Sequence, residues 1–321
     1  MKKILILFGG NSYEHKISCL SAKTILENID KEKYEVTTVG INKHNEWYIF
    51  KDNLELLNNN WEKGNITKVP NIVEYLKSFD KIFPIIHGNP EENGNLQGLF
   101  NLFNISYIGT NLLGSIISYD KGITKIICNK YNIPQVPSNT ITNKDIKNIN
   151  LDFPLIIKPA KCGSSIGVNI ANNKDELKKY INEAFLYDNK VIIEKYIKAR
   201  ELECSVLKNK QEKIAIIGEI KASNTFYDYE AKYEKISNII IPANISKELQ
   251  DEITKLSYKI FDILELKDLA RIDFLYDTTN DKLYFNEVNT MPGFTNASMY
   301  PLSFNKYGIT IKELITKLIE N

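Results

Sequence analysis

The chain has 321 residues, of which 43% are hydrophobic, so it can bury a sizeable core and should divide into more than one domain. Its 41 basic and 40 acidic residues leave a formal net charge of +1, which argues against nucleic acid or an anionic membrane as a partner. The 4 cysteines form no CxxC pair, which argues against a disulfide framework or a structural zinc site and favours a cytoplasmic protein.

The first part of the chain has the pattern of a Rossmann-like parallel sheet with crossover helices. Residues 3–8 form a continuous apolar run that ends in Gly9-Gly10, and apolar residues at helical spacing follow, which predicts a strand, a glycine turn and a helix. Further strands are expected at 34–41 and 81–86. We expect this first domain to cover residues 1–110. No apolar run reaches the roughly 20 residues that a membrane-spanning helix needs.

Two more units are expected after that domain, residues 111–190 and residues 191–321. A basic helix at 120–131 stops at a stretch with two prolines, since proline lacks an amide donor and restricts the residue before it. Residues 154–170 have the pattern of two strands joined by a loop of small residues, which predicts a hairpin. The last unit combines several strands with a helix expected at 246–264.

The most informative polar pattern lies on two expected strands near the C-terminus. Side chains alternate across a strand, so Arg271 and Asp273 share one face of the first strand. By the same rule, Glu287 and Asn289 share one face of the second strand. Carboxylate and amide oxygens suit Mg²⁺, but the pattern also fits a solvated strand face, and the spacing leaves both interpretations open.

Three loops carry weaker signals. Lys158 precedes the loop 163–167, whose glycines and serines fit either a phosphate cradle or an ordinary hairpin loop. His87 follows an expected buried strand, where open sheets usually bind ligands, but it also fits a plain polar loop. Residues 226–233 mix aromatic and charged side chains, which fits either a lid that closes over a ligand or an exposed loop.

Together and in this order, these motifs resemble the D-alanine–D-alanine ligases of the ATP-grasp superfamily over nearly the whole chain. The resemblance implies an α/β chain, α+β overall, in which an N-terminal Rossmann-like parallel-sheet domain precedes a two-part ATP-grasp fold. It also implies an enzyme that joins two D-alanines, uses ATP as co-substrate, passes through an acylphosphate and releases ADP and phosphate. The dipeptide would serve peptidoglycan synthesis.

The resemblance assigns the two substrate subsites. Glu14, in the opening motif 9–18, would hold the amino group of the first D-alanine. His87 belongs to a His-Gly loop in which Asn93 stands where an aspartate is common. Arg271 and the amide of Gly293 would receive the negative charge that develops during the reaction. The substrate-binding residues implied in this way are Glu14, His87, Arg271, Gly293, Ser298 and Met299.

Catalytic, nucleotide and metal roles are implied as well. The catalytic residues are Glu14, Ser164, Tyr233 and Arg271. The ATP-binding residues are Lys121, Lys158, Ser164, Ser165, Glu194, Lys195, Glu201 and Lys232. Two Mg²⁺ ions, for which Mn²⁺ can substitute, would be held by Asp273, Glu287 and Asn289. Cys162 stands where many relatives carry an acidic residue.

Two alternatives stay beside this hypothesis. A ligase for D-lactate or for another amino acid would share the fold, and subsite residues such as Tyr233 and Ser298 distinguish these enzymes. Tyr233 favours D-alanine, because the D-lactate-using relatives usually lack a tyrosine there. A nucleotide-binding regulatory module without catalysis is the alternative from another class, but the retained metal ligands and phosphate lysines argue against it. The resemblance also implies a homodimer.

Overall fold

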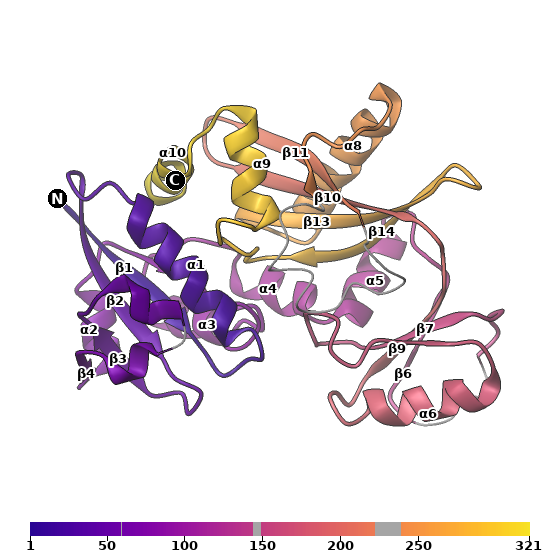
Figure 1. Ribbon diagram of the computed structural model, residues 1–321, viewed down its shortest axis with the longest axis horizontal. Coiled ribbons are helices and arrows are strands. Elements are labelled where there is room, and N and C mark those ends of the chain that lie inside the picture. Colours follow the sequence, from indigo (N-terminus) through magenta and orange to yellow (C-terminus); the bar gives the residue numbers. More distant parts are fainter. Residues whose placement is uncertain (59, 144–148, 222–238) are drawn as a thin grey trace.

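The computed structural model describes the whole chain except residue 59 and the segments 144–148 and 222–238 (Figure 1). The expected lid at 226–233 therefore lies outside the described residues. In the described part, the strands form one mixed sheet and two antiparallel sheets, each packed against helices. None of the described helices is long and apolar enough to cross a bilayer.

The N-terminal sheet has the strand order β4-β3-β2-β1-β5. Its strands β2, β1 and β5 run parallel, as expected, whereas β3 and β4 add an antiparallel extension that the sequence analysis did not foresee. Its elements are β1 (Lys2–Gly9), α1 (His15–Asn28), β2 (Tyr34–Ile41), β3 (Trp47–Phe50), the short 3₁₀ turns η1 (Leu54–Asn58) and η2 (Trp61–Lys63), β4 (Ile66–Lys68), α2 (Ile72–Lys77), β5 (Lys81–Pro84) and α3 (Asn95–Leu102).

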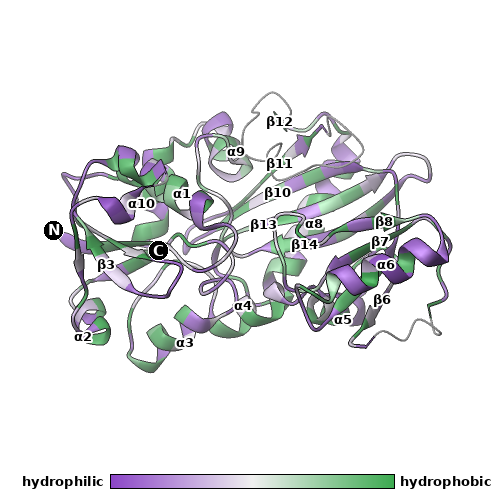
Figure 2. Ribbon diagram, turned by 60° about the horizontal axis from the view of Figure 1, so that its bottom comes forward, coloured by the Kyte–Doolittle hydropathy of each residue, from purple (hydrophilic) through white to green (hydrophobic). Residues whose placement is uncertain are grey.

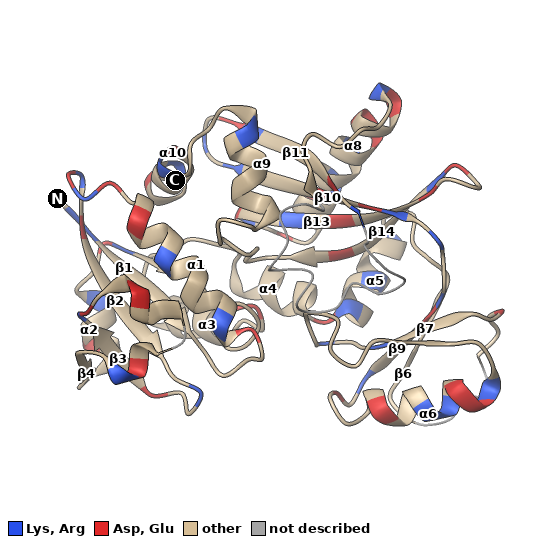
Figure 3. Ribbon diagram, viewed as in Figure 1, with Lys and Arg blue, Asp and Glu red and all other residues tan. Residues whose placement is uncertain are grey.

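The central sheet is antiparallel, with the strand order β6-β9-β7-β8. Helix α6 covers it with its apolar residues Leu177 and Ile181, while charged residues of both signs lie along the helix (Figures 2 and 3). The elements of this part are α4 (Leu112–Tyr119), α5 (Lys121–Lys130), β6 (Ser138–Ile141), β7 (Leu155–Pro159), β8 (Asn169–Ala171), α6 (Lys174–Ala184) and β9 (Val191–Lys195). The hairpin β7–β8 carries the predicted small-residue loop at its tip.

The C-terminal sheet is also antiparallel, with the order β12-β11-β10-β13-β14. Helix α8 packs on one face through Ile253, Ile260 and Phe261. The elements are β10 (Arg200–Lys208), β11 (Lys213–Ile220), β12 (Ile239–Ile240), α8 (Lys247–Ile263), β13 (Asp268–Asp277), β14 (Lys282–Asn289), α9 (Met299–Tyr307) and α10 (Ile311–Glu320). Within the described residues, the helices α2, α3, α4, α9 and α10 were not foreseen from the sequence.

One hydrophobic core joins the two ends of the chain. Ile4, Ile6 and Phe8 on β1 pack in the same cluster as Tyr300 on α9 and Leu318 on α10. The alternate residues of β1 belong to a second cluster on the other face of the sheet, with residues of α2 and α3. A strand that is covered on both faces needs a continuous apolar run, which is the pattern that predicted β1. The shared core holds the N-terminal sheet against the C-terminal sheet (Figure 1).

Candidate active site

A cavity of about 480 Å³ opens where the three parts of the chain meet. Its walls come from the loops after β1 and β5, from the start of α5, from the loop 161–167 and from the segment 287–299. Of the residues proposed from the sequence, the lining contains Glu14, His87, Lys121, Ser164, Arg271, Glu287, Asn289, Gly293, Ser298 and Met299. Residues that are far apart in the sequence are thus brought to one cavity.

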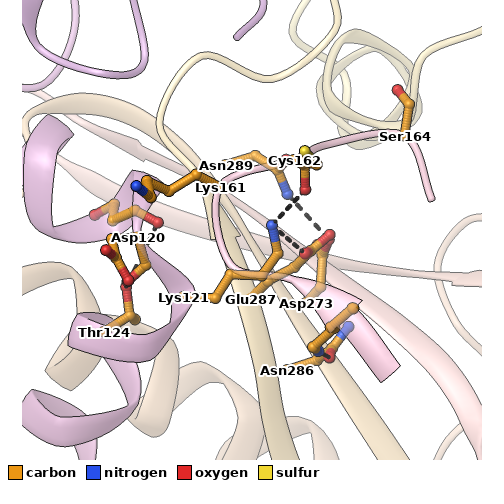
Figure 4. Close-up of polar contacts among 12 residues, drawn as sticks. Asp120, Lys121, Thr124, Lys161, Cys162, Ser164, Asp273, Asn286, Glu287 and Asn289 are labelled. Carbon is orange, nitrogen blue, oxygen red and sulfur yellow. Dashed lines mark hydrogen bonds and ion pairs between the residues drawn. The ribbon is translucent and has the colours of Figure 1, made fainter. Parts of the chain in front are cut away.

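Three neighbouring strands of the C-terminal sheet place acidic residues at paired positions, side by side across the sheet. Glu203 on β10 pairs in register with Asp273 on β13, and Asp273 pairs with Glu287 on β14. The guanidinium of Arg271 donates to both carboxylate oxygens of Asp273 at 2.8 Å, and its Nε lies 3.0 Å from the Glu203 carboxylate. Asn289 donates its Nδ2 to Asp273 at 3.0 Å (Figure 4). The arginine, the carboxylates and the amide form one polar cluster.

The register of β13 and β14 shifts beside Asp273, where Asn286 is skipped and forms a β-bulge. Lys158 Nζ donates to Asn286 Oδ1 at 3.4 Å. Lys121 Nζ lies 3.4 Å from Glu287 Oε2. Two adjacent residues of β14 therefore each meet one of the two lysines that were expected to contact phosphate, which regular alternation along a strand would not allow.

Lys121 is held at the N-terminus of α5, a position that favours anions because the helix dipole is positive there. Asp120 caps this helix by accepting from the amides of Gly122 and Ile123 at 3.0 and 3.2 Å. Lys121 Nζ donates to the carbonyl oxygen of Cys162 at 2.9 Å (Figure 4). Burial works to lower the pKa of Lys121, but Glu287 outweighs it and the pKa is raised. The lysine is charged and tied to the 161–167 loop.

A buried carboxylate lies between two buried lysines behind the cavity. Glu194 Oε2 lies 2.7 Å from Lys158 Nζ, and Glu194 Oε1 lies 2.6 Å from Lys125 Nζ. Burial works to raise the pKa of Glu194, but the two lysines outweigh it and lower the pKa. Burial lowers the pKa of Lys125, although Glu194 opposes this. Lys158 is thereby held in place by a buried anion.

Glu14 connects the N-terminal sheet to the loop between β7 and β8. Its Oε1 accepts a hydrogen bond from Ser164 Oγ at 2.6 Å, across 150 residues of sequence. The loop bends sharply here, since Ser164 and Ser165 have φ values of 51° and 57°, in the left-handed region. A Cβ atom on Gly163 would lie 2.8 Å from the Glu14 carboxylate, so a larger residue there would push this carboxylate out of its present position.

The segment after β14 forms part of the cavity wall and is in contact with His87. His87 is buried, and its Nδ1 lies 2.9 Å from the carbonyl oxygen of Met291. Burial lowers the pKa of His87, because the charged ring is poorly solvated there. Ser298 Oγ accepts from the amide of Thr295 at 3.0 Å, which closes a tight turn beside Gly293. This segment presents the backbone of Gly293 to the cavity.

Glu92 is a further acid in the wall of the cavity. It accepts from the amide of Gly88 at 2.7 Å. Burial, and then the negative charge of Glu14, raise the pKa of Glu92 to about 7 from the usual 4.5. The folded protein therefore keeps a proton on Glu92 that the unfolded chain loses, so stability falls as the pH rises from 4.5 to about 7.

A Glu92→Gln variant should lose this pH dependence, because glutamine keeps an oxygen for the Gly88 amide but does not ionise. Relative to the wild type, the variant is expected to gain stability between about pH 4.5 and about pH 7 and to keep that advantage at higher pH. Urea unfolding midpoints of both proteins across this range are the measurement. Parallel pH profiles of the two proteins would show that Glu92 has an ordinary pKa.

The remaining residues proposed from the sequence lie outside this cavity lining or outside the described residues. Ser165 follows Ser164 in the 161–167 loop, Lys195 is exposed at the end of β9, and Glu201 is half-buried at the start of β10. Lys232 and Tyr233 belong to the segment that the structure does not describe.

Sequence analysis missed Glu203, Lys125 and Asn286. Glu203 is a buried acid between the apolar residues Leu202 and Cys204 of β10, and an acid in such a place was a signal that could have found it. Lys125 is a buried lysine on an amphipathic helix, but nothing near it in sequence indicates its partner Glu194. Asn286 meets Lys158 only because of the bulge, which left no signal in the sequence.

The polar cluster fits a hard divalent cation. Asp273 and Glu287 supply carboxylate oxygens on paired strands, and Asn289 directs its Nδ2 to Asp273, which leaves Oδ1 as the oxygen it can offer. Mg²⁺ usually takes few protein ligands and completes its shell with water and substrate phosphates. No group of three or more His, Cys, Asp or Glu residues arranged for a metal occurs in the described part of the chain.

The arrangement of a Rossmann-like domain followed by two antiparallel units, which contribute lysines and carboxylates to one cavity, defines an enzyme of the ATP-grasp type. Family models described as D-ala D-ala ligase N-terminus and D-ala D-ala ligase C-terminus match residues 3–110 and 127–320. The chain belongs to the D-alanine–D-alanine ligase family, and it is a ligase that uses ATP.

Individual relatives cover almost the whole chain. A D-alanine–D-alanine ligase of Caldicellulosiruptor bescii is 42% identical, covering 99% of this chain and 94% of the relative. The VanG D-Ala:D-Ser ligase of Enterococcus faecalis superposes with a TM-score of 0.88 at 34% identity, covering 99% of this chain and 98% of that one. A D-alanine–D-alanine ligase of Bacillus anthracis complexed with ATP has a TM-score of 0.77 at 28% identity, covering 100% and 97%.

Proposed function

We propose that this protein joins two D-alanines into D-alanyl-D-alanine for peptidoglycan precursor synthesis, with ATP converted to ADP and phosphate through an acylphosphate. The observation that carries the proposal is the meeting, in one cavity, of the Glu14–Ser164 contact with Lys121, Arg271 and the carboxylates beside it. An amino acid needs an anion for its ammonium group, and an activated carboxyl group needs cations around it. The cavity supplies both.

In the first step, the carboxylate of the first D-alanine attacks the terminal phosphate of ATP. Glu14 holds the ammonium group of this D-alanine, and the bond from Ser164 fixes the carboxylate that does so. Lys121 and Lys158 reduce the repulsion between substrate carboxylate and triphosphate, and Lys158 exchanges Glu194 for phosphate. Phosphoryl transfer of this kind depends mainly on positioning and charge stabilisation, so no covalent enzyme intermediate is needed.

Asp273, Glu287 and Asn289 are the residues that would hold Mg²⁺, in the proposal two ions for which Mn²⁺ can substitute. The metal supplies positive charge at the phosphate oxygens. Arg271 and Asn289 donate hydrogen bonds to the carboxylate oxygens of Asp273 and hold them in position. The oxygen atoms of Asp273 that would bind the metal are therefore in position before the nucleotide binds.

In the second step, the neutral amine of the second D-alanine attacks the acylphosphate. Negative charge develops on the former carbonyl oxygen, and Arg271 together with the amide of Gly293 receives it. Ser298 and Met299 border the place of the second substrate in the cavity lining. His87 is a further substrate-binding residue in the lining of this cavity.

The remaining assignments rest on the family resemblance. Ser165, Glu194, Lys195 and Glu201 complete the nucleotide site, Lys232 approaches the terminal phosphate, and Tyr233 joins Glu14 and Ser164. The division of the chain into residues 1–110, 111–190 and 191–321 is also part of the proposal, as is a cytoplasmic location, where ATP is available.

A homodimer completes the proposal. The consecutive helices α3, α4 and α5 expose the large apolar side chains Leu102, Leu113, Ile116 and Ile126, a combination that usually marks a protein interface. Burial of these side chains against a second copy would remove them from water. Sedimentation of the purified protein should give the mass of a dimer, and a monomer mass at micromolar concentration would contradict this part of the proposal.

The test of the function is ADP and phosphate release by the purified protein with ATP, Mg²⁺ and either D-alanine, L-alanine, D-lactate or D-serine, with mass detection of the product. D-serine is included because one structural relative is a D-Ala:D-Ser ligase. Release that requires D-alanine and yields D-alanyl-D-alanine is the expected result. A different preferred pair would refute the substrate assignment, and no release with any pair would favour a regulatory nucleotide-binding module.

A further inference from the structure

A series of buried hydrogen bonds connects helix α1 to the segment that contains Gly293. Ser21, in the middle of α1, is fully buried. Its Oγ accepts from the amide of Phe294 at 3.0 Å and lies 3.0 Å from Nε2 of His87. The other ring nitrogen of His87, Nδ1, lies 2.9 Å from the carbonyl oxygen of Met291. The segment 291–294 is therefore held at both ends, on either side of Gly293.

The chemistry of the partners determines where each proton lies. The carbonyl oxygen of Met291 can only accept, so His87 must carry a proton on Nδ1. In a neutral imidazole Nε2 is then an acceptor, and the hydroxyl proton of Ser21 points to it. The oxygen of Ser21 remains available to accept from the Phe294 amide. Every donor in this series of buried hydrogen bonds thus has one acceptor. This pairing requires both a neutral His87 and a hydroxyl group at position 21.

The position of Gly293 is narrowly defined between these two anchors. A Cβ atom on Gly293 would lie 2.8 Å from Ser298 Oγ, so the backbone there is already in close contact with the turn that follows. Any displacement of Phe294 or Met291 moves the Gly293 amide relative to Arg271. Reaction rates are sensitive to such shifts, since a misplacement of about 1 Å can cost on the order of 100-fold.

We propose that Ser21 is a positioning residue of this enzyme, which acts through His87 and Phe294 to set the place of the Gly293 amide and of the second-substrate subsite. The inference rests on the proposed function, because that function gives the Gly293 amide its role. Ser21 itself is buried and does not line the cavity. Its effect on the reaction therefore passes through the segment 291–294.

The same helix offers a matched control in Ser18. Ser18 is also fully buried, accepts from the amide of Gly9 at 2.7 Å and donates to the carbonyl oxygen of Ile85 at 2.6 Å. It makes the same kinds of bonds as Ser21, but to β1 and to the residues after β5. A Ser18→Ala variant therefore loses a comparable pair of buried hydrogen bonds without touching the segment 291–294.

The kinetic test compares wild type, Ser21→Ala and Ser18→Ala. Ser21→Ala is expected to lower kcat by about 10-fold or more and to raise KM for the second D-alanine, with KM for ATP within about 2-fold of wild type. Ser18→Ala should lose a similar amount of stability in urea and leave KM for the second D-alanine within about 2-fold of wild type. Equal kinetic constants in the two variants would overturn the proposal. Ser21→Cys, which keeps a weaker donor, is expected to give an intermediate kcat, and it replaces Ser21→Ala if that variant does not fold.

Hydrogen exchange of the backbone amides gives a readout that does not depend on turnover. Ser21→Ala should speed exchange in peptides that cover Phe294 to Ser298, whereas Ser18→Ala should leave these peptides at the wild-type rate. Unchanged exchange in Ser21→Ala would overturn the proposed link whatever the activity. If the wild type forms no dipeptide, the proposed function fails, while the exchange data still decide whether Ser21 holds this segment.

Discussion

An Arg271→Ala variant is expected to lose at least about 100-fold in kcat, equivalent to about 2.7 kcal/mol, because removal of one oxyanion donor typically has an effect of this size. Arg271 lines the same cavity as Gly293, and its position is fixed by two bonds to Asp273 and one contact with Glu203. The measurement is steady-state dipeptide formation at saturating ATP and D-alanine. Near wild-type turnover would overturn this role.

The same substitution also has a structural consequence that needs a control. Without Arg271, the buried carboxylates of Glu203 and Asp273 lose their shared counter-ion, and loss of one partner of a buried ion pair costs about 3–5 kcal/mol. A double variant, Arg271→Ala with Glu203→Gln, removes one of the two charges and should recover part of the stability. Its kcat should stay at least about 100-fold low, because the oxyanion donor is still missing.

A Glu287→Gln variant is expected to reduce ADP formation at ordinary Mg²⁺ concentrations by at least about 100-fold. Replacement of groups that merely support metal ligands costs about 10–100-fold, so loss of a charged ligand should reach the upper end of that range or exceed it. Lys121 also loses the carboxylate that lies 3.4 Å from its Nζ. Higher Mg²⁺ concentrations should restore part of the rate, and a titration of rate against Mg²⁺ measures this.

The matched control for Glu287 is Asp281, which lies in the turn between β13 and β14. The substitution Asp281→Asn removes one negative charge from the same hairpin. Asp281 bonds to the hydroxyl of Tyr276 at 2.6 Å and lies outside the cavity lining. Asp281→Asn should keep the wild-type dependence on Mg²⁺. A shift of equal size in both variants would mean that the general charge of the hairpin, and not metal ligation by Glu287, sets the dependence.

Local patterns predicted many of the described elements. The apolar run 3–8 gave β1 because a strand covered on both faces has no polar side to alternate with. The prolines after 131 ended α5, and period-two alternation placed Arg271 with Asp273 and Glu287 with Asn289. These features depend on neighbours within a few residues, so sequence alone contains them.

Other features depend on which strands and helices become neighbours. Glu203 joins the polar cluster because β10 pairs with β13, and Asn286 meets Lys158 because of a bulge in the adjoining pair. Lys125 on α5 finds Glu194 on β9, and Ser21 finds His87 and Phe294 across 66 and 273 residues. None of these contacts leaves a periodic pattern.

The sequence by itself therefore determined the order and type of many elements, most of the acidic and basic residues of the site, and the family to which they point. Tertiary structure decided the register of the strands, the partners of the buried charges and the hydrogen-bonded chain behind Gly293. The physical reason is range: side-chain periodicity and turn chemistry act between near neighbours. Burial of polar groups is decided by whichever distant residues can satisfy them once the core has formed.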